Sequence, residues 1–285
     1  MRILLATMGM DIGGAETHIL ELAKELKRRK HEVYVVSNGG KYVEELEKYN
    51  IMHIWAPLNN KKPWNMIKSY NIIRDFIKQK DIEIVHSHSR ISSYICGLLH
   101  KKYKFKYITT AHWTFKVTPL LKKMTNWGEI TIAVSDDIKD YLIKNYNILE
   151  KNIIVTVNGI DTKKFKDNIE YEDIKKEFHL KDTINRIVYI SRLDESRALV
   201  AKQLINIAPK LEKQIKDLEI IIVGGGDSFE ELNQMAQNIN NKLGKNLIIM
   251  TNSRTDVNKF ASIGKIFIGV SRSALEAMSA KRPTI

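Results

Sequence analysis

The chain has 285 residues, of which 44% are hydrophobic, with 14 glycines and 5 prolines. This composition excludes a disordered or low-complexity chain and allows two α/β domains of ordinary size. The single cysteine, Cys96, excludes an internal disulfide and is typical of a reducing compartment. No apolar run is long enough for a membrane span or for the core of a signal peptide. We therefore expect a cytoplasmic protein.

The formal net charge of +13 is concentrated in one segment, because no acidic residue occurs between Glu83 and Glu129. Lysines over residues 101–123 predict attraction to an anionic membrane, at its inner face. Aromatic residues in the segment are candidate interfacial anchors: Tyr103, Phe105, Trp113, Phe115 and Trp127. The alternative is a lysine-rich composition that makes every surface basic. Nucleic acid is not an expected partner, because no reader motif accompanies the charge.

Short β-branched runs alternate with amphipathic stretches, which is typical of parallel strands joined by crossover helices. Several runs are apolar almost throughout, as in strands covered on both faces. We therefore expect an α/β fold. The expected strands are residues 2–7, 31–37, 51–56, 82–88, 106–111, 130–135, 153–157, 186–191, 219–223, 247–250 and 265–270.

A boundary between two domains is expected near the middle of the chain. A polar stretch, residues 161–184, interrupts the alternation and indicates a junction between a first domain, residues 1–165, and a second domain, residues 166–285. Residues 283–285 look like the opening of a further buried strand, so we expect the second sheet to be incomplete. The expected helices include residues 15–29, 136–145, 171–178, 198–215, 228–240, 255–262 and 273–280.

Gly13 and Gly14 stand immediately before the first helix. Glycines at this position allow a backbone to approach a ligand, and a helix N-terminus favours a phosphate. The alternative is a tight turn that needs a positive φ.

Three histidines end two of the expected strands. His86 and His88 should point to one face of a strand, and His112 should lie at the end of the next strand. Parallel strands present such residues at their carboxyl edge, where α/β proteins bind ligands. Three histidines there could bind zinc, but a hydrogen bond to a ligand or a buried neutral imidazole is the more common role.

In the second domain, Arg192 follows a strand and Arg197 lies near the start of the next helix, an arrangement suited to clamping a diphosphate. They could equally be surface arginines. The glycine run that includes Gly225 could approach a nucleotide, and Glu276 could accept hydrogen bonds from a ribose diol or simply favour a helix dipole.

In their order and spacing these motifs resemble the family-four retaining glycosyltransferases of the GT-B fold over essentially the whole chain. The first domain is similar in Gly13-Gly14-Ala15-Glu16, His86 and His88, Thr109-Thr110-Ala111-His112, Ala133-Val134-Ser135 and Val157-Asn158-Gly159-Ile160-Asp161. The second is similar in Ser191-Arg192-Leu193, Val223-Gly224-Gly225-Gly226 and Leu275-Glu276-Ala277-Met278.

The resemblance implies two Rossmann-like domains, an acceptor-side first domain and a second domain that binds a nucleotide-sugar. Arg192 and Arg197 would neutralise the donor diphosphate, Glu276 would hold the ribose, and Gly13, Gly14 and Gly225 would approach the donor. His112 would contact the transferred sugar, with Glu16, His86 and His88 on the acceptor side. No cofactor and no metal are expected, and no Asp-X-Asp sequence occurs.

Three positions depart from the family pattern. The family usually has lysine where Arg197 stands, and a first glutamate eight residues before Glu276, where this chain has Ile268. A glycine expected in the turn before Pro283 is replaced by Lys281 or Arg282, which should strain that turn. Family members normally continue for roughly another 80–100 residues. We therefore expect residues 1–285 to be inactive or poorly soluble if they were the whole protein.

The leading hypothesis is retaining, metal-independent transfer of a hexose or N-acetylhexosamine to a cell-envelope glycan or lipid-linked acceptor. The second is a catalytically silent nucleotide-sugar binder or truncated remnant, suggested by Ile268 and by the expected incomplete second domain. The third is a metallohydrolase built on His86, His88 and His112. Sugar-nucleotide epimerases are a rival with a similar fold.

Overall fold

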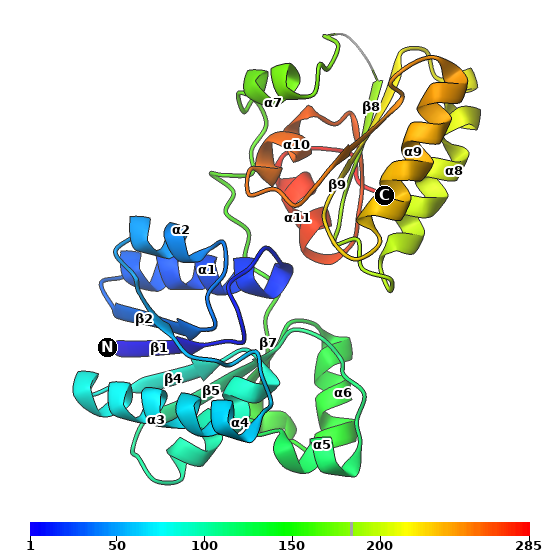
Figure 1. Ribbon diagram of the computed structural model, residues 1–285. Helices are drawn as coiled ribbons and strands as arrows, with labels where there is room; N and C mark the ends of the chain where they lie inside the picture. The colour runs from blue at the N-terminus through cyan, green and yellow to red at the C-terminus, as the bar shows by residue number, and fades with distance from the viewer. Residues whose placement is uncertain (183–184) are drawn as a thin grey trace. The chain divides into compact units, whose positions relative to one another are not determined.

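The computed structural model describes residues 1–182 and 185–285, which form two compact units, residues 1–159 and 160–285 (Figure 1). The domain boundary expected at residues 165 and 166 lies slightly further along the chain. The last residues of the expected junction, 183–184, lie outside the described part.

The first unit contains a seven-stranded, all-parallel sheet with the strand order β3-β2-β1-β4-β5-β6-β7. All seven strands expected in this part of the sequence are present, with ends shifted by one or two residues. The strands are β1 (Arg2–Ala6), β2 (Glu32–Ser37), β3 (Met52–Trp55), β4 (Ile84–Ser87), β5 (Lys106–Ala111), β6 (Ile130–Ala133) and β7 (Ile153–Val155).

Helices cover both faces of this sheet because side chains alternate along each strand. Ile3 and Leu5 of β1 pack with α1 and α2 in one core, whereas Leu4 and Ala6 pack with α3 and α4 in another. The helices are α1 (Gly14–Arg28), α2 (Val43–Lys48), α3 (Pro63–Lys80), α4 (Arg90–His100), α5 (Pro119–Met124) and α6 (Asp136–Tyr146), with a 3₁₀ turn, η1 (Glu150–Asn152).

The second unit contains a four-stranded parallel sheet with the order β10-β9-β8-β11. One face packs against α8 and α9, and the other against α7, α10 and α11 (Figure 1). The elements are α7 (Glu172–Glu177), β8 (Asn185–Ile190), α8 (Ala198–Gln214), β9 (Leu218–Val223), α9 (Phe229–Leu243), β10 (Ile248–Thr251), α10 (Val257–Ile263), β11 (Ile266–Ile268) and α11 (Ser271–Ser279).

The last residues of the chain extend the second sheet. Thr284 forms a parallel bridge with Phe267 of β11, and Phe267 N–H donates to the Pro283 carbonyl at 2.8 Å. The expectation that residues 283–285 begin another strand agrees with this pairing. Just before it, Lys281 has a φ of +57°, so the turn expected to need glycine does place a lysine in the left-handed region.

Candidate functional site

The first candidate site lies at the carboxyl edge of the seven-stranded sheet, beside β1, where the strand order reverses. β1 lies between β2 and β4, so α1 leaves β1 toward one side while the chain later returns on the other. Such a switch point is where open parallel sheets bind ligands. His88 follows β4 and His112 follows β5, as the sequence predicts.

The two histidines of the β4 edge lie on one face, with ring centroids 4.1 Å apart, so this prediction is confirmed. His86 is buried and its Nε2 lies 2.7 Å from the Thr110 hydroxyl. Burial, followed by the neighbouring His18, lowers the pKa of His86 to about 3. His86 is therefore a neutral imidazole held inside the unit.

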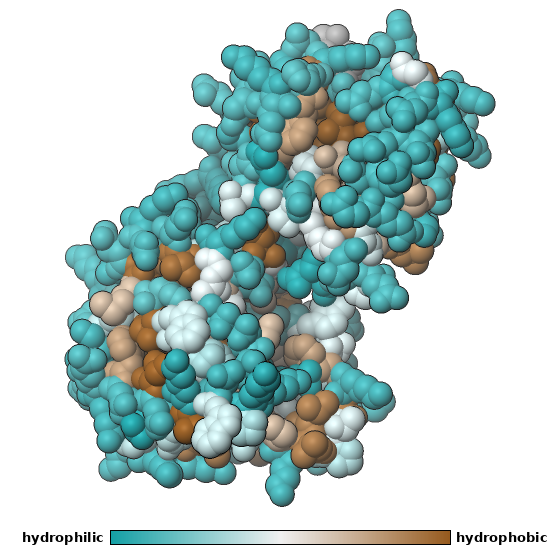
Figure 2. Space-filling view, viewed as in Figure 1, coloured by the Kyte–Doolittle hydropathy of each residue, from teal (hydrophilic) through white to brown (hydrophobic). Residues whose placement is uncertain are grey.

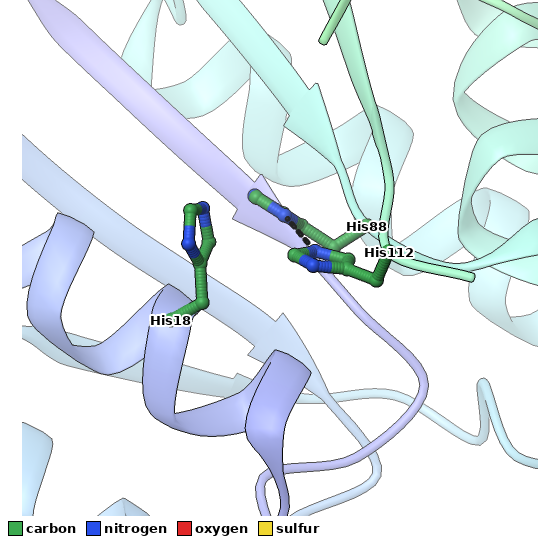
Figure 3. A group of neighbouring side chains, drawn as sticks. All are labelled: His18, His88 and His112. Carbon is green, nitrogen blue, oxygen red and sulfur yellow. Dashed lines mark hydrogen bonds between the residues drawn. The ribbon is translucent and has the colours of Figure 1, made fainter. Parts of the chain in front are cut away.

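A third histidine joins this edge from a helix. His88 Nδ1 lies 3.1 Å from His112 Nε2, and the His18 ring from α1 lies 5.0 Å from the His112 ring, between centroids. Figure 3 shows the His18 side chain extending from its helix toward the other two. One ring nitrogen from each of the three lies within 4.8 Å of the others. Burial above all, and then the neighbouring histidines, lowers the pKa of His88 well below its ordinary value.

This arrangement changes the alternative interpretation of a zinc triad made of His86, His88 and His112. His86 bonds Thr110, and His18 takes its place in the group of potential metal ligands among the described residues. His18 was not among the residues expected at this edge. Its signal was its position one helical turn after Gly14, which places both residues on the same side of α1.

Gly13 and Gly14 form the start of α1, as expected. Gly13 precedes the helix with an extended backbone, φ −174°, which any residue can adopt, so the alternative of a positive-φ turn is wrong. A Cβ atom added to the exposed Gly14 would meet nothing within 4 Å. Nothing in the first unit requires glycine there, which leaves room for a ligand. Glu16 lies in the first turn of the same helix, half-buried.

The second candidate site lies at the carboxyl edge of the four-stranded sheet. Arg192 follows β8, and Arg197 immediately precedes α8, as the sequence predicts. Arg197 Nη1 lies 2.7 Å from Asp194 Oδ2, so a carboxylate of the same loop already holds this guanidinium. Asp194 therefore positions one half of the expected diphosphate clamp.

The glycine run after β9 packs directly on the loop after β8. Gly224 and Gly226 have φ values of +155° and +151°, and a Cβ on either would collide with the backbone of Ser191 or Leu193. A Cβ on Gly225 would come within 2.5 Å of polar atoms of Asn252 and Ser253. Close packing of three loops therefore accounts for these glycines, and a donor contact by Gly225 remains a prediction.

Glu276 lies on α11, where Arg272 one turn earlier donates a 2.8 Å hydrogen bond from Nε to its Oε1. Both side chains are buried, with relative exposures of 7% for Arg272 and 8% for Glu276. Arg272 was not among the expected site residues, although its i,i+4 spacing from Glu276 was a signal. Ile268, where the family pattern has a glutamate, is in β11 and packs against the apolar core.

The lysines of residues 101–123 lie at two separate places in the first unit, at the amino end and beyond the carboxyl end of β5. Lys101 to Lys106 lie before or at the amino end of β5, whereas Lys116 follows its carboxyl end, roughly 15–20 Å away along the strand. Phe105 is buried and Tyr103 and Trp127 pack against apolar cores, so these three are not interfacial anchors. Trp113 is 56% exposed.

Exposed apolar residues lie near the lysines that follow the carboxyl end of β5. Leu120 and Met124 of α5 are exposed beside Lys122 and Lys123. Figure 2 shows a face that is mostly hydrophilic, with smaller hydrophobic patches. Within the part of the chain that the structure covers, no helix is long and apolar enough to span a bilayer.

Two family models match the chain, and together they cover both units. Residues 12–164 match the model described as Glycosyltransferase Family 4, and residues 184–285 match Glycosyl transferases group 1. The first match alone covers more than half of the chain. This chain belongs to glycosyltransferase family 4. The resemblance inferred from the ordered motifs is thereby confirmed.

Curated relatives of the chain are also named as enzymes that transfer or attach sugars, at sequence identities of 23–26%. The chain is 26% identical over 248 residues to the phosphatidylinositol N-acetylglucosaminyltransferase GPI3 subunit of Saccharomyces cerevisiae, covering 80% of this chain and 53% of that protein. It is 23% identical over 253 residues to α-monoglucosyldiacylglycerol synthase of Streptococcus pneumoniae, covering 80% and 56%. This family 4 chain therefore spans about half the length of the curated relatives it matches.

Solved structures confirm the α/β architecture with two Rossmann-like domains of the GT-B fold. A glycosyltransferase from Rickettsia africae superimposes with a TM-score of 0.79 at 26% identity, covering 99% of this chain and 78% of that one. HepE of Anabaena in complex with UDP and glucose gives 0.77 at 16% identity, covering 100% and 80%.

Proposed function

We propose that this family 4 chain is part of an enzyme that transfers a hexose or N-acetylhexosamine from a nucleotide-diphosphate sugar to a lipid-linked or glycan acceptor. The observation that carries the proposal is the carboxyl edge of the second sheet. There Arg192 and Arg197 follow β8, and α11 presents the buried Glu276. Cations for a diphosphate and a carboxylate for a ribose diol are the groups that a nucleotide-sugar needs.

The reaction proposed is transfer with retention, without a metal ion. Departure of the nucleotide diphosphate leaves negative charge on its oxygens, and preorganised cations stabilise that charge without further reorganisation. Arg192 and Arg197 would supply the cations, and Asp194 holds Arg197 in place. His112 would contact the transferred sugar, and the backbone at Gly14 and Gly13 would approach the donor from the N-terminus of α1.

Relatives and neighbours indicate which substrates to try. HepE of Anabaena is solved with UDP-glucose, and relatives of the chain are named for phosphatidylinositol and diacylglycerol acceptors. UDP-sugars and membrane lipids are therefore the first donor and acceptor classes for this chain. Glu16, His86 and His88 are the proposed acceptor-side residues.

A lipid acceptor requires that the protein work at a membrane surface, which we propose to be the cytoplasmic face. The proposed contact surface is the carboxyl-side part of residues 101–123, where Lys116, Lys122 and Lys123 are exposed beside Trp113 and Leu120. Lysines near an anionic surface each contribute about 1 kcal/mol, and exposed aromatic and aliphatic side chains add apolar contact.

The proposal is tested with radiolabelled UDP-glucose and UDP-N-acetylglucosamine, presented with vesicles that contain phosphatidylinositol or diacylglycerol. We expect label in the lipid fraction, and we expect Arg192→Ala to remove at least about 99% of it, because one lost donor at the leaving group costs roughly 3–4 kcal/mol. Lys202→Ala, an exposed lysine on α8, is the control. An Arg192→Ala rate equal to that of the control would overturn the assignment.

A second candidate, a catalytically silent nucleotide-sugar binder, is favoured by one observation. Ile268 places an apolar, half-buried side chain where the family pattern has a carboxylate. Calorimetric binding of UDP-glucose without transfer or hydrolysis would support this candidate. Sugar transfer by the Ile268→Glu variant would then show that the missing carboxylate at this position causes the lack of activity.

A further inference from the structure

We propose that His18, His88 and His112 form a binding site for a borderline divalent transition-metal ion, with Zn²⁺ as the representative ion. The site is contained in the first unit: His18 comes from α1, and the other two follow β4 and β5. One ring nitrogen of each residue lies within 4.8 Å of the other two (Figure 3).

The geometry is close to that of a metal centre with three histidine ligands. Zinc–nitrogen bonds are about 2.0–2.1 Å long, so two ligands of a tetrahedral ion have nitrogens about 3.3 Å apart. His88 Nδ1 and His112 Nε2 are already 3.1 Å apart, in a hydrogen bond whose proton a metal ion would replace. A ring nitrogen of His18 lies within 4.8 Å of the others, so the His18 side chain has to move closer by at most about 1.5 Å, which a side-chain rotation can provide.

The donor set selects the class of ion. The three ligands are imidazoles, which suit zinc, copper and nickel, whereas magnesium and calcium require oxygen ligands. Three histidines leave the fourth tetrahedral position open for water or another ligand. His88 is buried, while His18 and His112 are half-buried, so an ion can reach the cluster from the solvent side.

The neighbouring residues restrict the cluster to these three ligands. His86, whose ring lies 4.1 Å from that of His88, directs Nε2 to Thr110 and not into the site. The alternative interpretation is a purely structural stack of imidazoles, because the ring centroids of His18 and His112 are 5.0 Å apart in a T-shaped arrangement. The two interpretations differ in one measurable property, which is affinity for metal.

The test uses the purified chain, Zn²⁺ and a colorimetric zinc chelator as competitor at neutral pH. We expect one Zn²⁺ per chain, and His18→Gln should weaken binding at least about tenfold, since loss of even an outer-shell partner costs 10–100-fold. His31→Gln, in the link between α1 and β2, is the matched control and should bind as the unaltered chain does. No stoichiometric uptake, or equal affinity in His18→Gln, would overturn the proposal.

A second readout does not depend on the variant. Co²⁺ in place of Zn²⁺ should give the intense visible bands of a tetrahedral, nitrogen-ligated ion with the unaltered chain. A weak octahedral spectrum would contradict the site even if His18→Gln proved unstable.

One consequence rests on the proposed function. An ion bound to His112 would withdraw that residue from the transferred sugar, so stoichiometric Zn²⁺ should inhibit transfer and EDTA should restore it. A chain that binds Zn²⁺ but transfers no sugar in zinc-free buffer would contradict the proposed function and leave the site standing. Zinc binding without inhibition would contradict only the link through His112.

Discussion

Arg272 Nε donates a 2.8 Å hydrogen bond to Glu276 Oε1 within α11, and both side chains are buried. Because a buried carboxylate requires partners, this bond fixes the orientation of the group proposed to bind ribose. Arg272 is thus a positioning residue for Glu276.

Replacing Arg272 by Gln should lower the stability of the second unit by about 1.5–3 kcal/mol, the usual contribution of a hydrogen bond to a charged group. Hydrogen exchange of α11 and β11 measures this effect. Lys202→Gln is the control, because the Lys202–Glu231 pair is exposed and should contribute less than about 1 kcal/mol. Equal protection in the two variants would show that the Arg272 bond contributes nothing.

Gly14→Ala should keep the fold and reduce sugar transfer. A Cβ at Gly14 meets no atom within 4 Å, and alanine is a better helix former than glycine, so the melting temperature should stay equal or rise. Turnover should fall, because the added methyl group occupies the space proposed for the donor. Unchanged turnover would remove Gly14 from the donor site.

Gly40→Ala provides the contrast within the same unit. Its backbone has a φ of +139°, and a Cβ there would lie 2.4 Å from the backbone of Met10 and Asp11. This variant should lose stability, by about 1–3 kcal/mol. Thermal unfolding followed by tryptophan fluorescence reports on it, because all four tryptophans, Trp55, Trp64, Trp113 and Trp127, are in the first unit.

The first unit should lose stability as the pH falls below about 6.5. Burial lowers the pKa of His86 from 6.5 to about 3, so the folded state keeps this histidine neutral while the unfolded state takes up a proton. The contribution of His86 is fully present above the unfolded pKa and falls by up to about 1.4 kcal/mol per pH unit between 6.5 and 3, and the lowered pKa of His88 adds to the slope in the same direction. Urea unfolding followed by tryptophan fluorescence measures the slope. His86→Gln should flatten it, and an identical slope would refute the role of His86.

Lys281→Gly should stabilise the second unit by about 0.5–1 kcal/mol. Lys281 follows α11 with a φ of +57°, a conformation that costs a non-glycine residue about 1–2 kcal/mol, offset partly by the greater entropy of unfolded glycine. The exposed Lys281–Asp167 ion pair that is lost contributes little. Hydrogen exchange of α11 measures the change, and Lys281→Ala, which keeps the strain, should show no gain.

The sequence alone determined which segments form strands, that these strands run parallel, and the edge at which the site residues lie. Runs such as Ile130–Ala133 are apolar on both faces, and this pattern requires a parallel sheet covered by helices on both sides. Since parallel strands end at a common edge, the sequence placed His88 and His112 at the same edge, and the pairing of β4 with β5 makes them neighbours.

Tertiary packing decided which side chains meet at that edge. His18 reaches the histidine pair because α1 packs on Ile3 and Leu5 of β1. This contact sets the orientation of α1 about its own axis, which no local sequence pattern specifies. Likewise, residues 101–123 form one continuous basic run in the sequence but extend along β5 in space. Strand periodicity is local and can be read from the chain, whereas contacts between elements depend on the packing of side chains distant in sequence.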